Sequence, residues 1–264
     1  MIDAIALYFR YIRHSIAAQL QYRISFVMLS TSHLLITGIE FLGLWALFDR
    51  FGAFGGWTLP EVALFYGTIQ VTFAFADAIG RGFDMFSVQV KSGEFDRLLL
   101  RPRSTILQLF GYEFTARRVG RFLQGLAVLI YAVVRLGLAN SVATYLLIPW
   151  TILGSTFLFL GLYVVQATIA FWTVESLEVM NTMTYGGVQS AQYPMAIYRR
   201  WFQRFFTFVV PLVCVAYFPM AMLIGRGPEP AIIGWFSPAT GLLFFTVSLR
   251  LWKLGIHHYT STGS

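Results

Sequence analysis

Three ionisable side chains inside apolar stretches are the first residues that could do chemistry. His33 and Glu40 interrupt the run from Ile24 to Phe48, on one helix face two turns apart. A charge at the centre of a membrane-spanning helix costs about 2.5–3.5 kcal/mol, so it is retained for a partner or a function. The two could contact a substrate or act as acid and base, or Glu40 could be a structural hydrogen-bond partner. Asp77 is expected to pair with Arg81, one turn later.

Motifs for nucleotide, metal or acyl chemistry do not accompany these groups. A phosphate-binding loop needs GxxxxGK[ST], yet Met85 and Val90 stand at the glycine positions before Lys91-Ser92. Neither HExxH nor GxSxG occurs. The sequence therefore predicts no catalytic, cofactor or metal site in this chain.

The composition explains where such residues must sit. Of 264 residues, 57% are hydrophobic and only 12% are charged, and the mean hydropathy is +0.67. Soluble domains carry about twice that share of charge, and disordered chains carry still more. The long apolar runs predict an all-α integral membrane protein with a single transmembrane domain over 1–264. The lone Cys214 lies in such a run and is expected to be a packing thiol.

Six membrane-spanning helices are predicted, because about 20 apolar residues cross a bilayer. The fifth is expected to be kinked or broken by Pro211 and Pro219. The basic residues divide sixteen to three between the two sides, which predicts that both termini are cytoplasmic. The net charge of +7 is thus assigned to membrane flanks and not to nucleic-acid binding. The predicted spans are 24–48, 62–79, 122–139, 144–168, 205–224 and 236–254.

The first 22 residues form a different kind of element. Apolar side chains recur at three- and four-residue steps from Ile2 to Leu20, with charged and polar residues opposite. This pattern is typical of an amphipathic helix on the membrane surface. The alternative is a helix packed on the protein's own cytoplasmic face.

The longest polar stretch follows the second predicted span. A helix from 83 to 91 should end at Ser92-Gly93, because glycine commonly ends helices. The next residues suit a short helix along the membrane that exposes Phe95 and Asp96 to the cytoplasm. An ordinary charged loop is the alternative.

Several local sequences resemble one family. The stretch VKSGEFDRLLLRPRSTILQ (90–108) is similar to a segment of a bacterial branch of the ABC-2 class of ABC-transporter permeases. FWTVESLEVMN (171–181), YPMAIY (193–198) and the ending WKLGIHHYTSTGS (252–264) resemble the same branch. The resemblance covers nearly the whole chain.

The resemblance implies the transmembrane half of an ABC exporter in the bacterial inner membrane. Two permease subunits, identical or sister chains, would enclose a path, and two copies of a separate ATPase would supply ATP and Mg²⁺ chemistry. It also implies a cytoplasmic coupling helix that contacts the ATPase within 83–102, with contact residues Phe83, Gly93, Glu94, Phe95, Asp96, Arg97, Arg101 and Pro102.

The second and fifth spans would line a path for hydrophobic or amphipathic cargo. The candidate path residues are Phe73, Phe75, Phe208 and Phe218, together with Glu40 and His33. Two other classes remain open from the residues alone: an intramembrane lipid-modifying enzyme and a membrane assembly factor that does not transport.

Overall fold

The computed structural model describes the backbone of residues 2–173 and 177–259, and the side chains of 6–173 and 182–259. All regular elements in these ranges are helical, and one isolated bridge joins Phe54 and Trp57. Parts of the family-like stretches at 171–181 and 252–264 lie outside the described residues. The main helices are α1 (Ile2–Gln21), α2 (Arg23–Phe51), α3 (Leu59–Asp84), α4 (Phe86–Lys91), α5 (Glu94–Leu99), α6 (Thr105–Phe110), α7 (Val119–Arg135), α8 (Val142–Ile169), α9 (Leu177–Ala191), α10 (Arg200–Phe208), α11 (Phe218–Leu223), α12 (Ile232–Phe236) and α13 (Ala239–His258).

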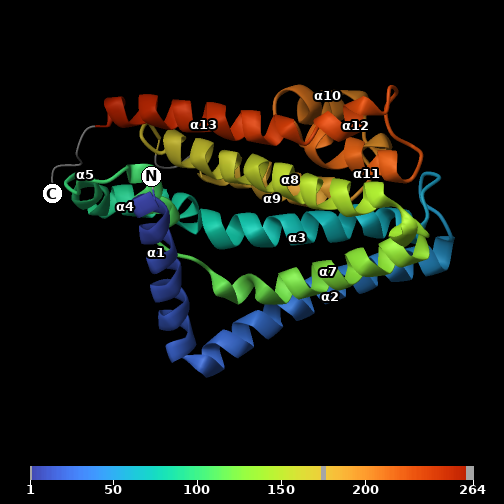
Figure 1. Ribbon diagram of the computed structural model, residues 1–264, viewed down its shortest axis with the longest axis horizontal. Coiled ribbons are helices and arrows are strands. Elements are labelled where there is room, and N and C mark those ends of the chain that lie inside the picture. The colour runs from blue at the N-terminus through green and yellow to red at the C-terminus, as the bar shows by residue number, and fades with distance from the viewer. Residues whose placement is uncertain (1, 174–176, 260–264) are drawn as a thin grey trace.

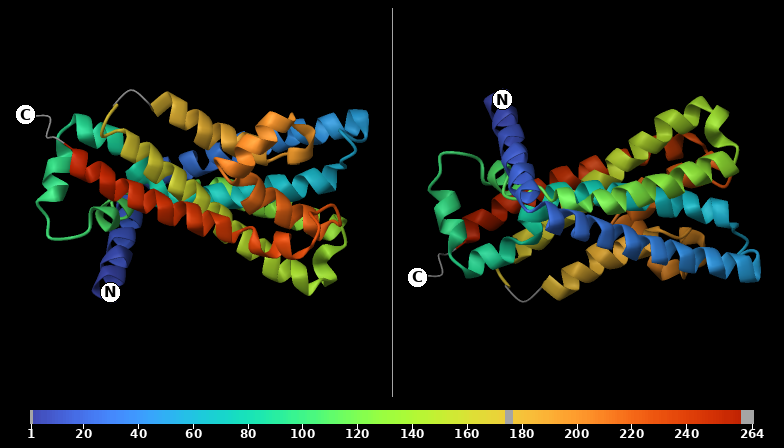
Figure 2. Two further views of the ribbon diagram at one scale, coloured as in Figure 1. Left: turned by 90° about the horizontal axis from the view of Figure 1, so that it is seen from above. Right: turned by 90° about the horizontal axis from the view of Figure 1, so that it is seen from below.

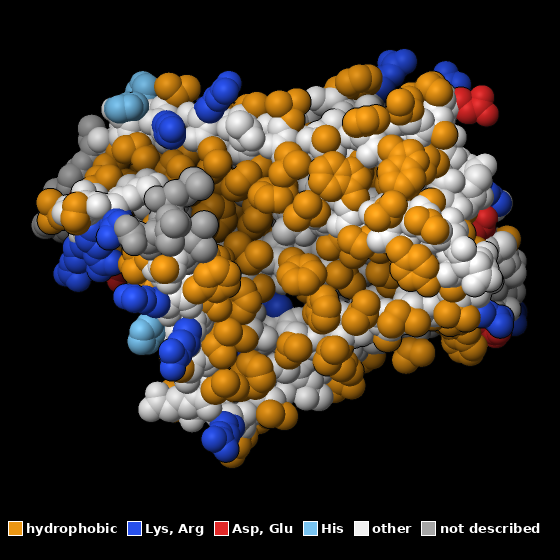
Figure 3. Space-filling model, in the orientation of Figure 1, with side chains coloured by type: hydrophobic (Ala, Val, Ile, Leu, Met, Phe, Trp, Pro, Cys, Tyr) orange, Lys and Arg blue, Asp and Glu red, His pale blue; other side chains and the backbone are white. Residues whose placement is uncertain are grey.

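The long helices lie side by side along the long axis of the molecule, and α1 runs across them (Figure 1). One end of the bundle carries α4, α5 and the end of α13, and we call it the α5 end. The other carries the α2–α3 connection with Trp57, and we call it the Trp57 end. Arginine and lysine side chains gather near both ends and along α1, whereas hydrophobic side chains cover the face between them (Figure 3).

Helix α3 is the centre of the bundle. It begins at a capping box in which Thr58 and Glu61 bond each other's backbone N–H groups. It packs against α7 and α8, and most of its apolar side chains are buried. Gly67 and Gly125 permit the contact with α7, because a Cβ on Gly67 would lie 2.6 Å from the backbone nitrogen of Leu129.

Helix α13 closes the bundle against α8 through two glycines. A Cβ on Gly241 would collide with the backbone carbonyl of Gly154, and one on Gly154 would collide with Pro238. Small residues of this kind let helices approach closely in membranes, where the hydrophobic effect does not drive them together.

Four stretches are long and apolar enough to cross a membrane: Arg23–Phe51, Leu59–Lys91, Val142–Ile169 and Ile232–His258. Helix α7 overlaps the third predicted span, but its 17 residues, about 26 Å, place it outside these four stretches. The fifth predicted span is broken, as the prolines predicted. There α10 and the segment Val213–Leu223 meet at 89°, so 205–224 is not one continuous helix.

Helix α9 is an element that the hydropathy pattern did not predict. It lies beside α3 and α8, and the Tyr185 ring meets Phe73 at 5.5 Å between centroids. It starts near the α5 end and leads toward the Trp57 end (Figure 2). There Ile197 lies 3.2 Å from the position of a Cβ on Gly55. Its polar residues, which include Thr182, Thr184, Gln189 and Ser190, hid it from an apolar-run criterion.

The path of the chain after α9 places three arginines away from their predicted position. Arg199, Arg200 and Arg204 were predicted on the same side as Arg97 and Arg101. They lie within seven residues of Ile197, Arg199 just before α10 and the other two in it, in the half of the bundle nearer the Trp57 end (Figure 1). The prediction of their side rested on 205–224 as the fifth crossing, and that stretch is not one continuous helix.

Candidate functional site

The α5 end contains two short helices, α4 and α5, which follow α3 through tight breaks. Helix α3 ends at Asp84, α4 ends at Lys91 as predicted, and Gly93 turns the chain with φ of +70°. That left-handed conformation strains any residue with a side chain, which explains glycine at this position. Helix α5 then begins at Glu94 and ends at Leu99, where a short helix was predicted.

Phe95 is the residue whose predicted position is wrong. Its side chain is 0% exposed, although the sequence interpretation placed it in the cytoplasm as a contact anchor. It packs edge-on against Phe86 at 4.8 Å and Tyr259 at 5.0 Å between ring centroids, and also meets Phe171 and Trp252. The aromatic residues that bury it come from distant parts of the chain, so local sequence did not reveal them.

Hydrogen bonds hold α5 against its neighbours. The hydroxyl of Tyr259 donates to Asp96 at 3.1 Å, and that of Tyr112 donates to Glu94 at 3.4 Å. The Gln108 amide donates to the carbonyls of Leu98 and Arg103, each at 3.1 Å. Burial, and then the adjacent carboxylate, raises the pKa of both Tyr112 and Tyr259. Both phenols therefore remain donors at neutral pH.

The exposed part of this segment is a leucine pair among arginines. Leu99, the last residue of α5, is 39% exposed, and Leu100, the next residue, is 86% exposed. The predicted contact residues Glu94, Arg97, Arg101 and Pro102 are also exposed, whereas Phe83 is buried against Trp252 and Phe110. An apolar pair framed by cations is suited to contact another protein. We call residues 97–103 the α5 tip.

His33 and Glu40 do not form one site, although they share a helix. The His33 ring lies 2.7 Å from a guanidinium nitrogen of Arg118, and that arginine pairs with Asp77 at 2.6 Å. Asp77 is therefore tied to Arg118 and not to Arg81, which instead pairs with Asp84. Arg118 was seen in the sequence only as one of several basic loop residues. The sequence feature that could have identified Arg118 is Asp77 on α3, because a carboxylate within an apolar helix needs a cation nearby.

Glu40 faces a groove of its own between α2 and the chain that follows α9. The cavity is about 450 Å³, and Phe48, Phe54, Tyr193 and Tyr198 contribute aromatic walls. Glu40 is exposed, and no lysine or arginine side chain among the described residues forms an ion pair with it. A carboxylate without a cation on an apolar helix is a candidate functional residue. We call this cavity the Glu40 groove.

The four aromatic residues predicted to line a path are spread over the bundle. Phe73 is 0% exposed and packs against Phe159 and Tyr185. Phe75 meets Phe122 at 5.3 Å, on the side of α3 that faces α7. The other two lie on the broken pair: Phe208 is 82% exposed and Phe218 is partly buried. Phe73 is thus a packing residue, and the four do not contact one another in the part of the chain that the structure describes.

The Trp57 end is fastened by one arginine. Arg226 pairs with Glu61 at 3.1 Å, donates to the carbonyl of Gly56 at 2.9 Å and lies 4.5 Å from the centre of the Trp57 ring. These contacts join the α2–α3 connection to the chain between α11 and α12.

Together these features define a multi-pass helical membrane protein with a transverse N-terminal helix and a compact segment at one end. A family model described as ABC-2 family transporter protein matches residues 34–263. The chain therefore belongs to the ABC-2 transporter family and is a transmembrane transport subunit whose family works with an ATP-binding subunit. Searches of curated proteins and of solved structures found no match.

Proposed function

We propose that the chain is the transmembrane half of a bacterial inner-membrane ABC exporter. Two permease subunits, identical or sister chains, would enclose a path for a hydrophobic or amphipathic substrate. Two copies of a separate ATPase would bind ATP and Mg²⁺ and drive it. The observation that carries the proposal is the α5 tip on a chain that belongs to the ABC-2 family. This tip offers an ATPase an exposed apolar contact surrounded by positive charge.

The tip and not Phe95 is the proposed contact with the ATPase. Burial of an exposed leucine at an interface is favourable, and flanking charges set orientation and association rate. Leu100→Glu should lower recovery of the ATPase with the tagged permease by about tenfold, the size of a hot-spot loss. Val88→Glu is the matched control, because Val88 is 51% exposed on α4, outside the tip. Equal loss in both variants, or in neither, would remove the tip as the contact.

We further propose six membrane crossings, with α9 as the fifth. The α5 end would face the cytoplasm, and α10 to α12 would lie toward the outside. Thirteen basic residues then lie on the cytoplasmic side and six outside, so the charge bias keeps its direction.

Single cysteines introduced into a Cys214→Ser chain test this topology. A membrane-impermeant thiol reagent should label positions 56, 200 and 227 from outside and leave position 92 unlabelled in intact cells. Labelling of position 200 only from the cytoplasmic side would restore 205–224 as the fifth crossing.

The Glu40 groove is the proposed part of the substrate path. Its aromatic walls suit an apolar body, and its carboxylate suits a hydrogen-bond donor or a positive charge on the same molecule. Glu40→Gln should reduce export of such an amphipathic probe while ATPase recruitment stays normal. Glu229→Gln, an exposed carboxylate in the α11–α12 connection, is the control. Unchanged export with Glu40→Gln would place the path elsewhere.

A further inference from the structure

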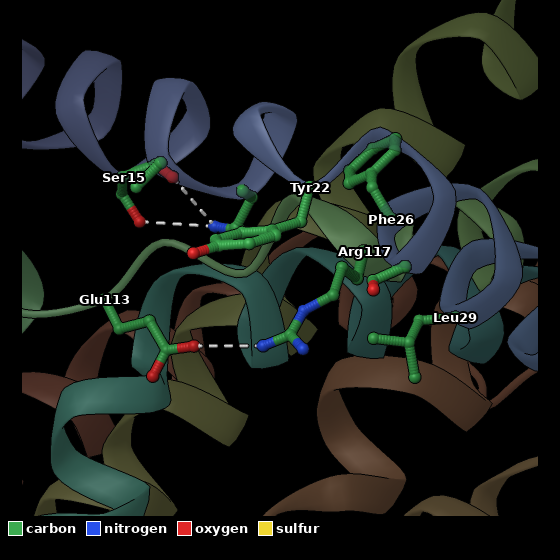
Figure 4. Close-up of a pocket in the computed structure, with 9 residues that line it drawn as sticks. Ser15, Tyr22, Phe26, Leu29, Glu113 and Arg117 are labelled. Atoms are coloured by element: carbon green, nitrogen blue, oxygen red, sulfur yellow. Dashed lines mark hydrogen bonds and ion pairs between the residues drawn. The ribbon is translucent and has the colours of Figure 1, made fainter.

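A second cavity lies toward the other end of α2 from the Glu40 groove, at the elbow between α1 and α2. Its volume is about 400 Å³ (Figure 4). The floor is the chain that leads into α7, with Glu113 and Arg117, and the walls are α1 and the first turns of α2. We call it the elbow pocket.

Helix α1 is hydrogen-bonded to the chain that leads into α7. The Ser15 hydroxyl donates to the carbonyl of Phe114 and accepts from its N–H, both at 3.0 Å. Gln19 donates to the same carbonyl. These bonds fix α1 across the bundle without filling the elbow, and the Tyr22 ring reaches over the opening (Figure 4).

The polar groups in the pocket have opposite charges and spare bonding capacity. Arg117 and Glu113 form an ion pair at 3.4 Å, and their side chains are 36% and 33% exposed. Only one carboxylate oxygen of Glu113 receives a hydrogen bond from the described residues, and the guanidinium has five N–H donors. Ser25 adds a hydroxyl-bearing residue, and Phe26 and Leu29 add an apolar wall along α2.

The geometry points to a bound phospholipid with a zwitterionic headgroup that carries a primary ammonium. The phosphate would lie on Arg117, the ammonium on Glu113, and an acyl chain along Phe26 and Leu29. Arginine is suited to phosphate, and the carboxylate would repel a headgroup that is only negative. The transverse direction of α1 and the exposed Tyr22 put the pocket where headgroups meet hydrocarbon, if α1 lies on the membrane as its pattern predicts.

Native mass spectrometry of the purified permease tests this assignment. The protein is titrated with phosphatidylethanolamine and, separately, with phosphatidylglycerol of the same acyl chains. Wild-type protein should retain phosphatidylethanolamine more strongly. Arg117→Ala should weaken its apparent affinity by about tenfold, the loss expected for a charge-assisted hydrogen bond. Arg13→Ala removes an exposed arginine of α1 that does not line the pocket, and it should leave the affinity unchanged.

Glu113→Gln supplies an independent arm, because it keeps the shape of the side chain and leaves Arg117 in place. It should erase the preference for phosphatidylethanolamine over phosphatidylglycerol. Unfolding temperatures in lipid-free detergent identify any variant that has lost its fold. Equal retention of both lipids by wild type, or the same affinity in Arg117→Ala and Arg13→Ala, would overturn the site and leave only a solvated ion pair.

Discussion

The buried side chain of Phe95 shows how a residue with the right chemistry for one role can serve another. A large aromatic side chain between Glu94 and Asp96 satisfies the usual criteria for an interface anchor. In the folded chain it fills the aromatic cluster under α5 instead. The consequence is that a substitution here tests stability before it tests ATPase binding.

We expect Phe95→Ala to destabilise the permease by about 3–5 kcal/mol, the usual cost of truncating a buried phenylalanine. Thermal unfolding in detergent, followed by tryptophan fluorescence, measures the loss. Leu100→Ala is the control, because an exposed side chain away from packing should change stability by no more than about 0.5 kcal/mol. Equal stability of Phe95→Ala and wild type would contradict the packing described for α5.

The second residue-scale prediction concerns Arg118. Its guanidinium neutralises Asp77, whose side chain is 1% exposed, and also contacts His33. Arg118→Gln leaves a buried carboxylate unpaired and should cost about 3–5 kcal/mol. Adding Asp77→Asn removes the orphaned charge and should recover most of that loss. A double variant no more stable than Arg118→Gln would mean that the two residues are not energetically coupled.

At the scale of elements, the crossing of α8 and α13 is the most sensitive contact. Gly241→Ala puts a methyl group into the Gly154 backbone, so the helices must separate. We expect lower thermal stability than wild type. Gly38→Ala is the matched control: it lies in a helix with nothing within 4 Å of the added atom. Alanine favours helix by about 1 kcal/mol over glycine, so this variant should be neutral or stabilising. Destabilisation of equal size in both would mean that the loss does not come from the close contact between α8 and α13.

The sequence was a good guide to elements whose signal is local. Apolar runs predicted α2, α3 and α8, glycine predicted the end of α4, and Pro211 lies at the 89° break. Helix α9 was missed because its polar residues, such as Thr184 and Gln189, interrupt any apolar run. The same limit applies to the sites: pairing of Arg118 with Asp77, and burial of Phe95 by Trp252, depend on contacts between residues far apart in the chain.

At the scale of the whole molecule, α2 is the most open of the long helices. Only 11% of its apolar window is buried, against 89% for α3. The side of α2 with the Glu40 groove also borders the residues after α9, where Tyr193 and Tyr198 line the cavity. A second permease subunit placed on this side would convert a lateral groove into an enclosed path.

The division of labour between subunits gives the last prediction. Purified permease alone, reconstituted in liposomes, should neither hydrolyse ATP nor move substrate, because no GxxxxGK[ST] motif is present. Addition of the purified ATPase should restore both activities together. A phosphate-release assay with and without the ATPase measures the first activity. Hydrolysis by the permease alone, undiminished after further purification, would be inconsistent with the proposed function.

The attachment of α5 to both α3 and α13 has a mechanical consequence. Helix α5 follows α3 through two short breaks. It also contacts the C-terminal part of the chain, because Tyr259 bonds Asp96 and the Tyr259 and Trp252 rings pack against Phe95. A force applied at Leu100 would therefore act on two helices, α3 and α13. Because Gly241 and Gly154 lock that last helix to α8 further along, the load reaches the Trp57 end by two routes. The bundle would then tilt as a stiff body, with little bending of any single helix.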